Sequence, residues 1–172
     1  MRLLIIDDEP GVLHALQRSL RLHYRDKLAI TTCNDPLAAL GLMRERPFDI
    51  VLSDLRMPET DGIELLSLAA AVLPRSVRML LTGTADFSTA QRAITDAGVF
   101  RYLCKPWTEA ELFAHLDAAI AQALLQGAAL AAPLSAQEME RRRLEALDPG
   151  ITRVERGPHG EVLMPPLPGD NA

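Results

Sequence analysis

Along most of the chain, short runs of apolar residues alternate with longer segments in which apolar positions recur at helical spacing. The runs are rich in Leu, Ile and Val, and most of them end at a polar or charged residue. Continuous apolar runs of this kind are typical of parallel strands that are covered on both faces. We therefore predict strands at Leu3–Ile6, Leu28–Thr32, Phe48–Ser53, Val77–Leu81 and Phe100–Cys104.

Helix signals lie between and after the predicted strands. Proline suits the first turn of a helix, Asp is a good N-cap, and Ser or Thr followed three residues later by Glu or Gln forms a capping box. Such starts lie at Pro10, at Asp35–Pro36, at Ser88 with Gln91 and at Thr108 with Glu111. The apolar stripes that follow are Leu13, Leu16 and Leu20; Leu37, Leu40 and Met43; and Leu112, Leu116, Ile120 and Leu124. A further helix is expected at Ile63–Ala71 after a loop at Arg56–Gly62, and the helix that starts at Ser88 ends near Gly98.

Five strands that alternate with helices indicate an α/β fold. This pattern implies a parallel sheet covered by helices on both faces, and right-handed crossovers leave few topologies. Five β-α units favour a flavodoxin-like (βα)5 doubly wound parallel sheet with strand order 2-1-3-4-5. We expect this domain to occupy residues 1–126.

Residues 127–172 lack the alternation of apolar runs and helical segments, and we predict that they form a short C-terminal helix-hairpin extension. An Ala-rich linker at Ala128–Pro133 precedes a short helix, which a capping box at Ser135 and Glu138 opens and which runs to about Leu147. A small hairpin follows, and the Pro-rich end is predicted to be extended or disordered. The strands of the hairpin are expected within Ile151–Arg156 and Glu161–Met164.

The last helix of the predicted domain is longer than its sheet requires. Residues beyond Gln122 would overhang the sheet, so Leu124, Leu125 and Leu130 need another partner. We expect the extension to fold back on the domain or to pair with a second copy of the chain. The alternative is a disordered remnant of a lost effector, because the Pro-rich end has a disordered composition.

Composition limits the kinds of partner. The 172 residues are 48 % hydrophobic and 24 % charged with a net charge of -5, which gives no electrostatic case for nucleic acid. Arg141–Arg143 lie among glutamates, which is typical of a solvated, salt-bridged helix face. No apolar stretch approaches the roughly 20 residues that span a bilayer, and the chain starts directly with a strand, so neither a membrane span nor a signal peptide is expected. Cys33 and Cys104 lack metal-type spacing and are predicted to be reduced, small hydrophobic residues of a cytoplasmic protein.

Polar side chains stand at the carboxyl ends of four predicted strands. In a parallel α/β sheet, ligands bind just outside these ends. The sheet would therefore bring carboxylates, a hydroxyl and an ammonium group to one pocket that suits a divalent cation and a phosphoryl group. The residues are Asp7 and Asp8, Asp54, Thr82 and Lys105.

The carboxylate cluster argues for a metal ion. Mg2+ prefers hard oxygen ligands and keeps several waters, so Asp8 and Asp54 can each supply one oxygen while Asp7 holds a metal-bound water. Without a cation, three carboxylates would repel one another and raise one another's pKa values. The ion would also neutralise a transferred phosphoryl group, and Lys105 can pair with Asp54 or with a phosphoryl oxygen. The Lys105–Pro106 bond is a candidate for a cis peptide.

The order of these motifs carries a resemblance to a known family. The motifs are Asp7-Asp8-Glu9, Asp54 with Met57-Pro58 and Asp61-Gly62, Thr82-Gly83, and Lys105-Pro106. This pattern resembles the receiver domain of bacterial two-component response regulators, and it covers residues 1 to about 126. The segments Leu81–Asp86 and Arg101–Trp107 look most like receivers attached to HD-type phosphodiesterases or hydrogenase-gene activators.

The resemblance implies a response regulator that is switched by phosphorylation and that is not an enzyme, apart from self-phosphorylation from a donor and autodephosphorylation. Asp54 would be the phosphoacceptor, Thr82 and Lys105 would contact the phosphoryl group, and Tyr102 would be the switch aromatic. The metal, Mg2+ or Mn2+, would be held by Asp7, Asp8, Asp54 and the backbone carbonyl of Arg56. The Arg56 side chain occupies a position that modulates phosphate lifetime in the family, by shielding the site or by hindering water.

The resemblance also implies partners. A sensor histidine kinase or a phosphotransfer protein would donate the phosphoryl group. A homodimer through the face made by the fourth helix, fifth strand and fifth helix, or through the extension, is a further expectation. About 46 residues follow the receiver, too few for a winged-helix, phosphodiesterase or ATPase effector, so we expect output through protein contacts without direct binding of nucleic acid or membrane.

Two other classes of protein fit the sequence less well. A phosphatase that forms an aspartyl-phosphate also needs an Asp nucleophile and magnesium. It normally has an acid/base group two residues further on, where this chain has Arg56, and a cap domain for which no insertion is large enough. A flavin- or nucleotide-binding domain needs a loop that accepts phosphate after the first strand, but Asp7–Gly11 is acidic and would repel phosphate.

Overall fold

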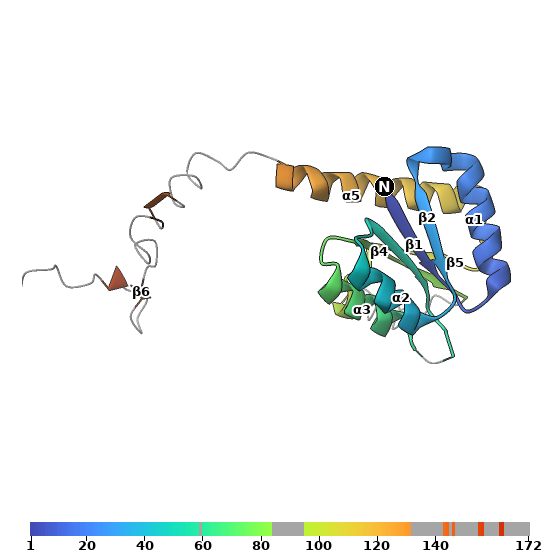
Figure 1. Cartoon of the computed structure of the whole chain (residues 1–172), viewed down its shortest axis with the longest axis horizontal. Helices are drawn as coiled ribbons and strands as arrows, with labels where there is room; N and C mark the ends of the chain where they lie inside the picture. The colour runs from blue at the N-terminus through green and yellow to red at the C-terminus, as the bar shows by residue number, and fades with distance from the viewer. Residues whose placement is uncertain are drawn as a thin grey trace, which may run out of the picture. The chain divides into compact units, whose positions relative to one another are not determined.

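The chain divides into two compact units, Met1–Ala129 and Leu130–Ala172. The computed structural model describes residues 1–58, 60–83, 95–131, 143–144, 146, 155–156 and 162–163. The first unit contains a five-stranded sheet and its covering helices (Figure 1). The predicted capping boxes at Ser88/Gln91 and Ser135/Glu138, and the Pro-rich end, lie outside the described residues.

The sheet has the predicted topology. Its strands are β1 (Arg2–Ile6), β2 (Ala29–Cys33), β3 (Ile50–Asp54), β4 (Val77–Thr82) and β5 (Arg101–Cys104). The helices are α1 (Pro10–Tyr24), followed by a 3-10 turn η1 (Arg25–Lys27), α2 (Pro36–Glu45), α3 (Gly62–Val72) and α5 (Glu109–Ala131). Every neighbouring pair of strands is parallel and the order is β2-β1-β3-β4-β5, so the predicted order 2-1-3-4-5 is confirmed.

The strands are apolar throughout because both faces of the sheet are covered. Alternate residues of a strand point to opposite faces. Leu3 and Ile5 pack in the core beneath α1 and α5, whereas Leu4 and Ile6 pack beneath α2 and α3. Figure 1 shows these two helix layers on either side of the sheet. A run of apolar residues without polar alternation is therefore what this position in the fold requires.

Helix starts follow the predicted local chemistry. The Asp35 carboxylate accepts hydrogen bonds from the backbone N–H groups of Leu37 at 2.8 Å and Ala38 at 3.2 Å, which caps α2. At the start of α5, the Glu111 carboxylate accepts from the Thr108 N–H at 2.8 Å, and the Glu111 N–H donates to Thr108 Oγ1 at 3.2 Å. This reciprocal pair is the predicted capping box, and these hydrogen bonds lower the pKa of Glu111.

Three expectations about single positions are wrong. Leu124 was placed on the apolar stripe of α5 with Leu112 and Leu116, but its side chain is 59 % exposed. Each step of four residues turns the stripe by about 40° around the helix, so after three steps it has left the buried side.

Leu37 was placed on the apolar stripe of α2, but its side chain is 64 % exposed, and Pro36, Ala39 and Met43 form the buried side. Pro36 is buried in the same turn, so Leu37 is exposed because it lies about 100° around the helix from the buried side and faces solvent. Cys104 is exposed rather than packed as a small hydrophobic residue, and Cys33 is only partly buried.

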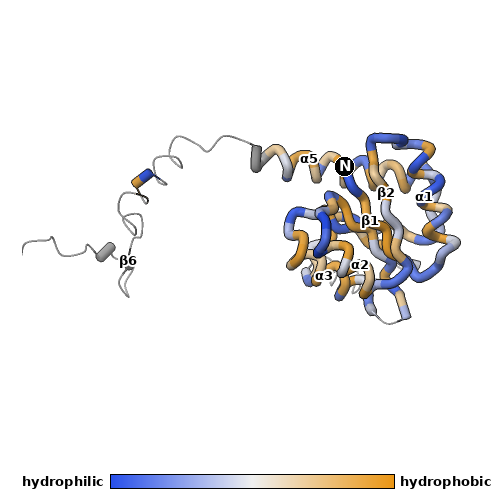
Figure 2. Tube along the Cα trace, viewed as in Figure 1, coloured by the Kyte–Doolittle hydropathy of each residue, from blue (hydrophilic) through white to orange (hydrophobic). Residues whose placement is uncertain are grey.

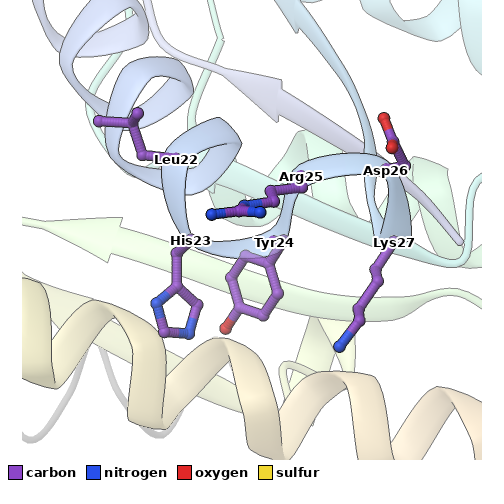
Figure 3. A pocket seen from close by; sticks show the side chains of 6 residues that line it. All are labelled: Leu22, His23, Tyr24, Arg25, Asp26 and Lys27. Carbon is purple, nitrogen blue, oxygen red and sulfur yellow. The ribbon is translucent and has the colours of Figure 1, made fainter.

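The C-terminal turn of α1 is joined to the first half of α5 by a hydrogen bond and by aromatic packing. Tyr24 donates a hydrogen bond from its hydroxyl to Asp117 Oδ1 at 2.8 Å, and the His23 ring stacks on the Phe113 ring with centroids 3.9 Å apart. Burial, together with the Asp117 carboxylate, raises the pKa of Tyr24. Figure 3 shows His23, Tyr24 and Lys27 pointing toward α5, beside a cleft of about 630 Å³ that η1 helps to line.

The second unit contains a short antiparallel pair of strands. They are β6 (Glu155–Arg156) and β7 (Val162–Leu163), and Arg156 pairs with Val162. Both strands lie inside the segments in which the hairpin was expected. In the described parts of the chain, no helix has the length and apolar character needed to cross a bilayer.

Two glycines in helices provide a matched pair for a stability test. A methyl group on Gly62 would collide with the backbone carbonyl of Asp54, whereas a methyl group on Gly41, inside α2, would meet nothing within 4 Å. We expect Gly62→Ala to lower the free energy of unfolding by about 2 to 3 kcal/mol. We expect Gly41→Ala to raise it by about 0.5 to 1 kcal/mol, because alanine is the better helix former. Urea unfolding measures both; equal effects of the two substitutions would contradict the close approach at Gly62.

Candidate functional site

The carboxyl edge of the sheet brings together three charged side chains from three strands. Asp7 follows β1 and is fully buried, Asp54 ends β3 and is 5 % exposed, and Lys105 follows β5. The Lys105 Nζ atom lies 2.8 Å from Asp7 Oδ2 and 2.5 Å from Asp54 Oδ1. A third carboxylate, that of Glu9, lies 3.8 Å from the same nitrogen but is exposed. One ammonium group therefore joins two buried carboxylates.

The backbone of the sheet places these groups. The Lys105 N–H donates to the carbonyl of Thr82 at 2.7 Å, and the Asp7 N–H donates to the carbonyl of Cys33 at 3.3 Å, so both residues continue the pairing of their strands. The peptide bond between Lys105 and Pro106 is cis, as its sequence suggested. By strand alternation, Asp7, Asp54 and Lys105 continue the face of the sheet that packs beneath α1 and α5.

Burial and pairing act in opposite directions on the two partners of this ion pair. Burial raises the pKa of Asp7, and its hydrogen bonds from Lys105 and from the Glu9 N–H offset this only in part. Burial alone would lower the pKa of Lys105, but its hydrogen bonds to Asp54 and Asp7 raise it above the usual value. Repulsion by Asp54 also raises the pKa of Asp7, which is the expected direction, but it is the smallest of the causes.

Both carboxylate oxygens and the backbone carbonyl of Asp54 have polar partners. Its Oδ2 atom accepts a hydrogen bond from the Arg56 N–H at 2.7 Å, and its other oxygen faces Lys105. Its backbone carbonyl accepts from Ser53 Oγ at 2.9 Å, and the first residue of α3, Gly62, approaches that carbonyl closely. The Arg56 side chain is exposed, and its backbone forms a bridge with Asp61. The Asp54 carboxylate is thus oriented by the Arg56 N–H on one oxygen and by Lys105 on the other.

Asp8 points to a different part of the edge. It is partly exposed and lines a cleft of about 220 Å³ with Asn34, Asp35, Pro36 and Pro58. Within the described residues, no three His, Cys, Asp or Glu side chains are grouped as a metal site. Magnesium does not require such a group, since it is usually bound through one or two carboxylates and several waters. The oxygen donors Asp7, Asp8 and Asp54, with the carbonyl of Arg56, therefore fit Mg2+ or Mn2+ by their chemistry.

Thr82 and Tyr102 lie on the strands beside Asp54. Thr82 ends β4 and is 2 % exposed, while Tyr102 on β5 is 43 % exposed. In the register of the sheet, Tyr102 pairs with Leu80 and Thr82 pairs with Cys104. Leu80 packs in the core beneath α2 and α3, so by strand alternation Thr82 shares that face, opposite to Asp54.

Sequence reasoning missed three contacts of this site. They are the Lys105–Asp7 ion pair, the hydrogen bond from Ser53 to the Asp54 carbonyl and the close approach of Gly62. For the Lys105–Asp7 ion pair, strand alternation was the available signal. Asp7 follows Ile5 by two residues and Lys105 follows Leu103 by two, and Ile5 and Leu103 lie in the same core cluster, so the two charged side chains point to the same face. The other two depend on the path of the loop between β3 and α3, which local sequence does not specify.

Comparison with known proteins assigns the family. Residues 3–117 match the response regulator receiver domain, and the chain belongs to this family. HoxA, a hydrogenase transcriptional regulatory protein of Cupriavidus necator, is 30 % identical over 124 residues, which are 72 % of this chain and 25 % of HoxA. GlrR, a transcriptional regulatory protein of Escherichia coli, is 34 % identical over 120 residues, which are 70 % of this chain and 26 % of GlrR. The chain thus spans about a quarter of the length of these curated relatives.

Solved structures agree with this assignment. An adenylate cyclase from Rhodopirellula baltica is 34 % identical with a TM-score of 0.67, and the match covers 74 % of this chain and 92 % of that one. The signal receiver domain of an HD domain-containing protein from Pseudomonas fluorescens Pf-5 is 31 % identical with a TM-score of 0.66, over 71 % of this chain and 95 % of that one. The predicted likeness to receivers of hydrogenase-gene activators and HD-type proteins is therefore confirmed.

The ion pair at the edge of the sheet predicts a coupled stability effect. We expect Lys105→Met to lower the free energy of unfolding in metal-free buffer by about 3 kcal/mol, because it leaves two buried carboxylates without a counter-charge. The double variant Asp7→Asn/Lys105→Met should recover most of this loss, since only one buried carboxylate then remains. Urea unfolding of the four proteins of this cycle measures the coupling.

A matched control is Lys27→Met, which removes an exposed lysine from η1 and should change stability little. Additive losses in the double variant would contradict the coupling of Asp7 to Lys105.

Proposed function

We propose that this protein is a response regulator of a two-component phosphorelay that accepts a phosphoryl group on Asp54 from a histidine kinase or a phosphotransfer protein. The observation that carries the proposal is the position of Asp54 at the carboxyl edge of the sheet. There it lies within reach of the Lys105 ammonium group and beside a second acidic position. Membership of the receiver family supports the same chemistry.

The geometry suits a transfer to a carboxylate. An oxygen of Asp54 would form a bond to phosphorus while the bond between phosphorus and the donor atom breaks and the donor keeps its electron pair. The Arg56 N–H orients the carboxylate, and Lys105, already beside Asp54, can pair with an oxygen of the incoming group. Magnesium held by Asp7, Asp8, Asp54 and the carbonyl of Arg56 would neutralise charge on the transferred group. The exposed Arg56 side chain would sit at the mouth of the site, where it can influence phosphate lifetime.

The proposed conformational switch would pass from Asp54 on β3 to Thr82 on β4 and then to Tyr102 on β5. A phosphoryl group adds about -1.5 to -2 charges and new acceptor oxygens. Thr82, which ends the neighbouring strand β4, would supply a hydroxyl donor to it. Movement of Thr82 toward Asp54 would open space into which the exposed Tyr102 ring turns. The ligand would shift a pre-existing equilibrium between two states of the surface around β5 and α5.

The proposal includes partners and location. The output would act through protein contacts of this surface or of the extension after residue 126, with a homodimer among them. The protein would have no separate enzymatic output, and it would bind neither nucleic acid nor membrane directly. We place it in the cytoplasm, where free thiols such as the exposed Cys104 stay reduced.

The acceptor is tested by phosphorylation with acetyl phosphate or a candidate kinase. We expect the intact mass to increase by one phosphoryl group in the presence of Mg2+, and we expect no increase for Asp54→Asn or with excess EDTA. The matched control Asp26→Asn changes an exposed aspartate at the other end of α1 and should be phosphorylated normally. Full uptake by Asp54→Asn would refute the assignment of the acceptor.

The switch is tested with beryllofluoride, which mimics the phosphoryl group. Amide NMR spectra with and without the mimic should show shifts at Thr82 and through residues 84 to 107, including Tyr102. Thr82→Ala should still bind the mimic but should lose most of the shift at Tyr102, because the hydroxyl that links the two faces is gone. Shifts confined to the loops around Asp54 in the unaltered protein would count against this switch.

A further inference from the structure

Arg78 is a charged residue inside a strand that is otherwise buried. Apolar colours predominate in the strands of the sheet in Figure 2, and the other residues of β4 are all buried. Arg78 itself is partly buried, and this burial lowers its pKa. Alternation along β4 places its side chain on the face of Leu80, which packs in the core beneath α2 and α3. A guanidinium group in such a position needs acceptors for its N–H groups.

Backbone carbonyl oxygens from the start of β4 and from the segment before β5 accept these hydrogen bonds. Arg78 Nε donates to the Ala97 carbonyl at 2.6 Å, and Nη1 donates to the Ser76 carbonyl at 2.9 Å. Nη2 lies 3.5 Å from the Gly98 carbonyl. Residues 95–97 are helical, and Gly98 has a φ of 56°, the left-handed conformation in which helices commonly end. The guanidinium group therefore lies at a helix C-terminus, where carbonyls without a helical partner and the helix dipole both favour a cation.

The backbone of Arg78 also starts the ladder between β4 and β5. The Phe100 N–H donates to the Arg78 carbonyl at 2.8 Å, and Arg101 then pairs with Met79. Side chain and backbone of Arg78 together hold residues 97–100, directly before β5 begins. β5 has four residues and lies at the edge of the sheet, with β4 as its neighbour. Its register therefore depends on this first contact, since a slip by one residue would turn every side chain of β5 to the other face.

Lys105 stands at the other end of this ladder, where its N–H donates to the Thr82 carbonyl at 2.7 Å. The observed register brings its ammonium group to Asp54 and Asp7. We propose that Arg78 is a positioning residue of the phosphoacceptor site, because it fixes the segment before β5 and thereby holds Lys105 beside Asp54. Without Arg78, Lys105 would be released from the carboxylates for part of the time. The inference rests on the proposed function in one respect, that Lys105 assists phosphoryl uptake.

Competition between Lys105 and a metal ion provides a measurement that a loss of structure would not reproduce. Lys105 and Mg2+ are both attracted to the carboxylates of Asp7 and Asp54, so release of Lys105 favours the metal. We expect Arg78→Met to raise the affinity for Mg2+, measured by titration calorimetry, by at least about twofold. Phosphoryl uptake from acetyl phosphate at saturating Mg2+ should become at least about threefold slower, because the incoming group loses a charged partner. General loosening of the site would lower the affinity and the rate together.

Amide hydrogen exchange shows where the change begins. In Arg78→Met, the Phe100 and Lys105 amides should exchange at least about tenfold faster, because both N–H groups donate to β4. The Asp7 amide, which follows β1, should exchange at its original rate. Arg78→Lys keeps a cation but offers one nitrogen in place of three, so it should change each measurement in the same direction and by less. If Arg78→Met does not fold, Arg78→Lys carries the same test.

The matched control is Arg46→Met. The Arg46 guanidinium group packs over the Phe48 ring and reaches Thr31 of β2, the strand at the other edge of the sheet. Its removal should leave Mg2+ affinity, phosphoryl uptake and exchange of the Lys105 amide unchanged.

Three results would overturn the proposal. The first is a fall in Mg2+ affinity together with phosphoryl uptake in Arg78→Met, because the whole site is then lost. The second is phosphoryl uptake at the original rate. The third is exchange at Phe100 and Lys105 that is no faster than in Arg46→Met. If the unaltered protein binds no Mg2+ or takes up no phosphoryl group, the proposed function fails, and exchange at Phe100 and Lys105 still decides whether Arg78 positions β5.

Discussion

The organisation of the domain depends on how one ammonium group neutralises two buried carboxylates. Asp7 and Asp54 are buried at the carboxyl ends of neighbouring strands, and the Lys105 ammonium group lies against both carboxylates. Removing one partner of a buried ion pair is costly, because it leaves the other charge without a counter-charge. Lys105 follows β5, and the hydrogen bond from its N–H to the Thr82 carbonyl of β4 positions it at this edge. The correct order of strands is therefore a precondition for balanced charge, and a sheet assembled in another order would leave the carboxylates unpaired.

The two edges of the sheet differ in the kind of contact that they contain. Near the C-terminus of α1, Tyr24 and His23 tie α1 to α5 through Asp117 and Phe113, contacts that combine aromatic packing with one hydrogen bond to a carboxylate. At the carboxyl edge, by contrast, buried polar groups replace apolar packing. A site of this kind is costly to bury, and the apolar layers on both faces of the sheet offset that cost.

Strand positions, strand order and two helix caps were predictable because each has a local cause. Apolar runs indicate strands covered on both faces, and Asp35 and Thr108 carry their capping chemistry in their own side chains. Leu37 was misplaced because apolar residues of α2 fit more than one helical stripe, and the spacing alone does not show that the stripe of Pro36, Ala39 and Met43 is the buried one. The meeting of Asp7, Asp54 and Lys105 at one edge was predictable from their place after the strands. The pairing of Lys105 with Asp7 was not, because it depends on which strands are neighbours and on the depth at which each side chain is buried.

The contact between Gly62 and the Asp54 carbonyl has a mechanical consequence. The N-terminus of α3 lies directly against the backbone of Asp54, so that backbone has no room to move toward α3. On the other side, Leu55 is hydrogen-bonded to Leu81 of β4 at 2.8 Å. The backbone at Asp54 is thus held between a helix terminus and a strand. A side chain at position 62 would have to displace this backbone, so the geometry of the candidate site depends on a single hydrogen atom in a neighbouring helix.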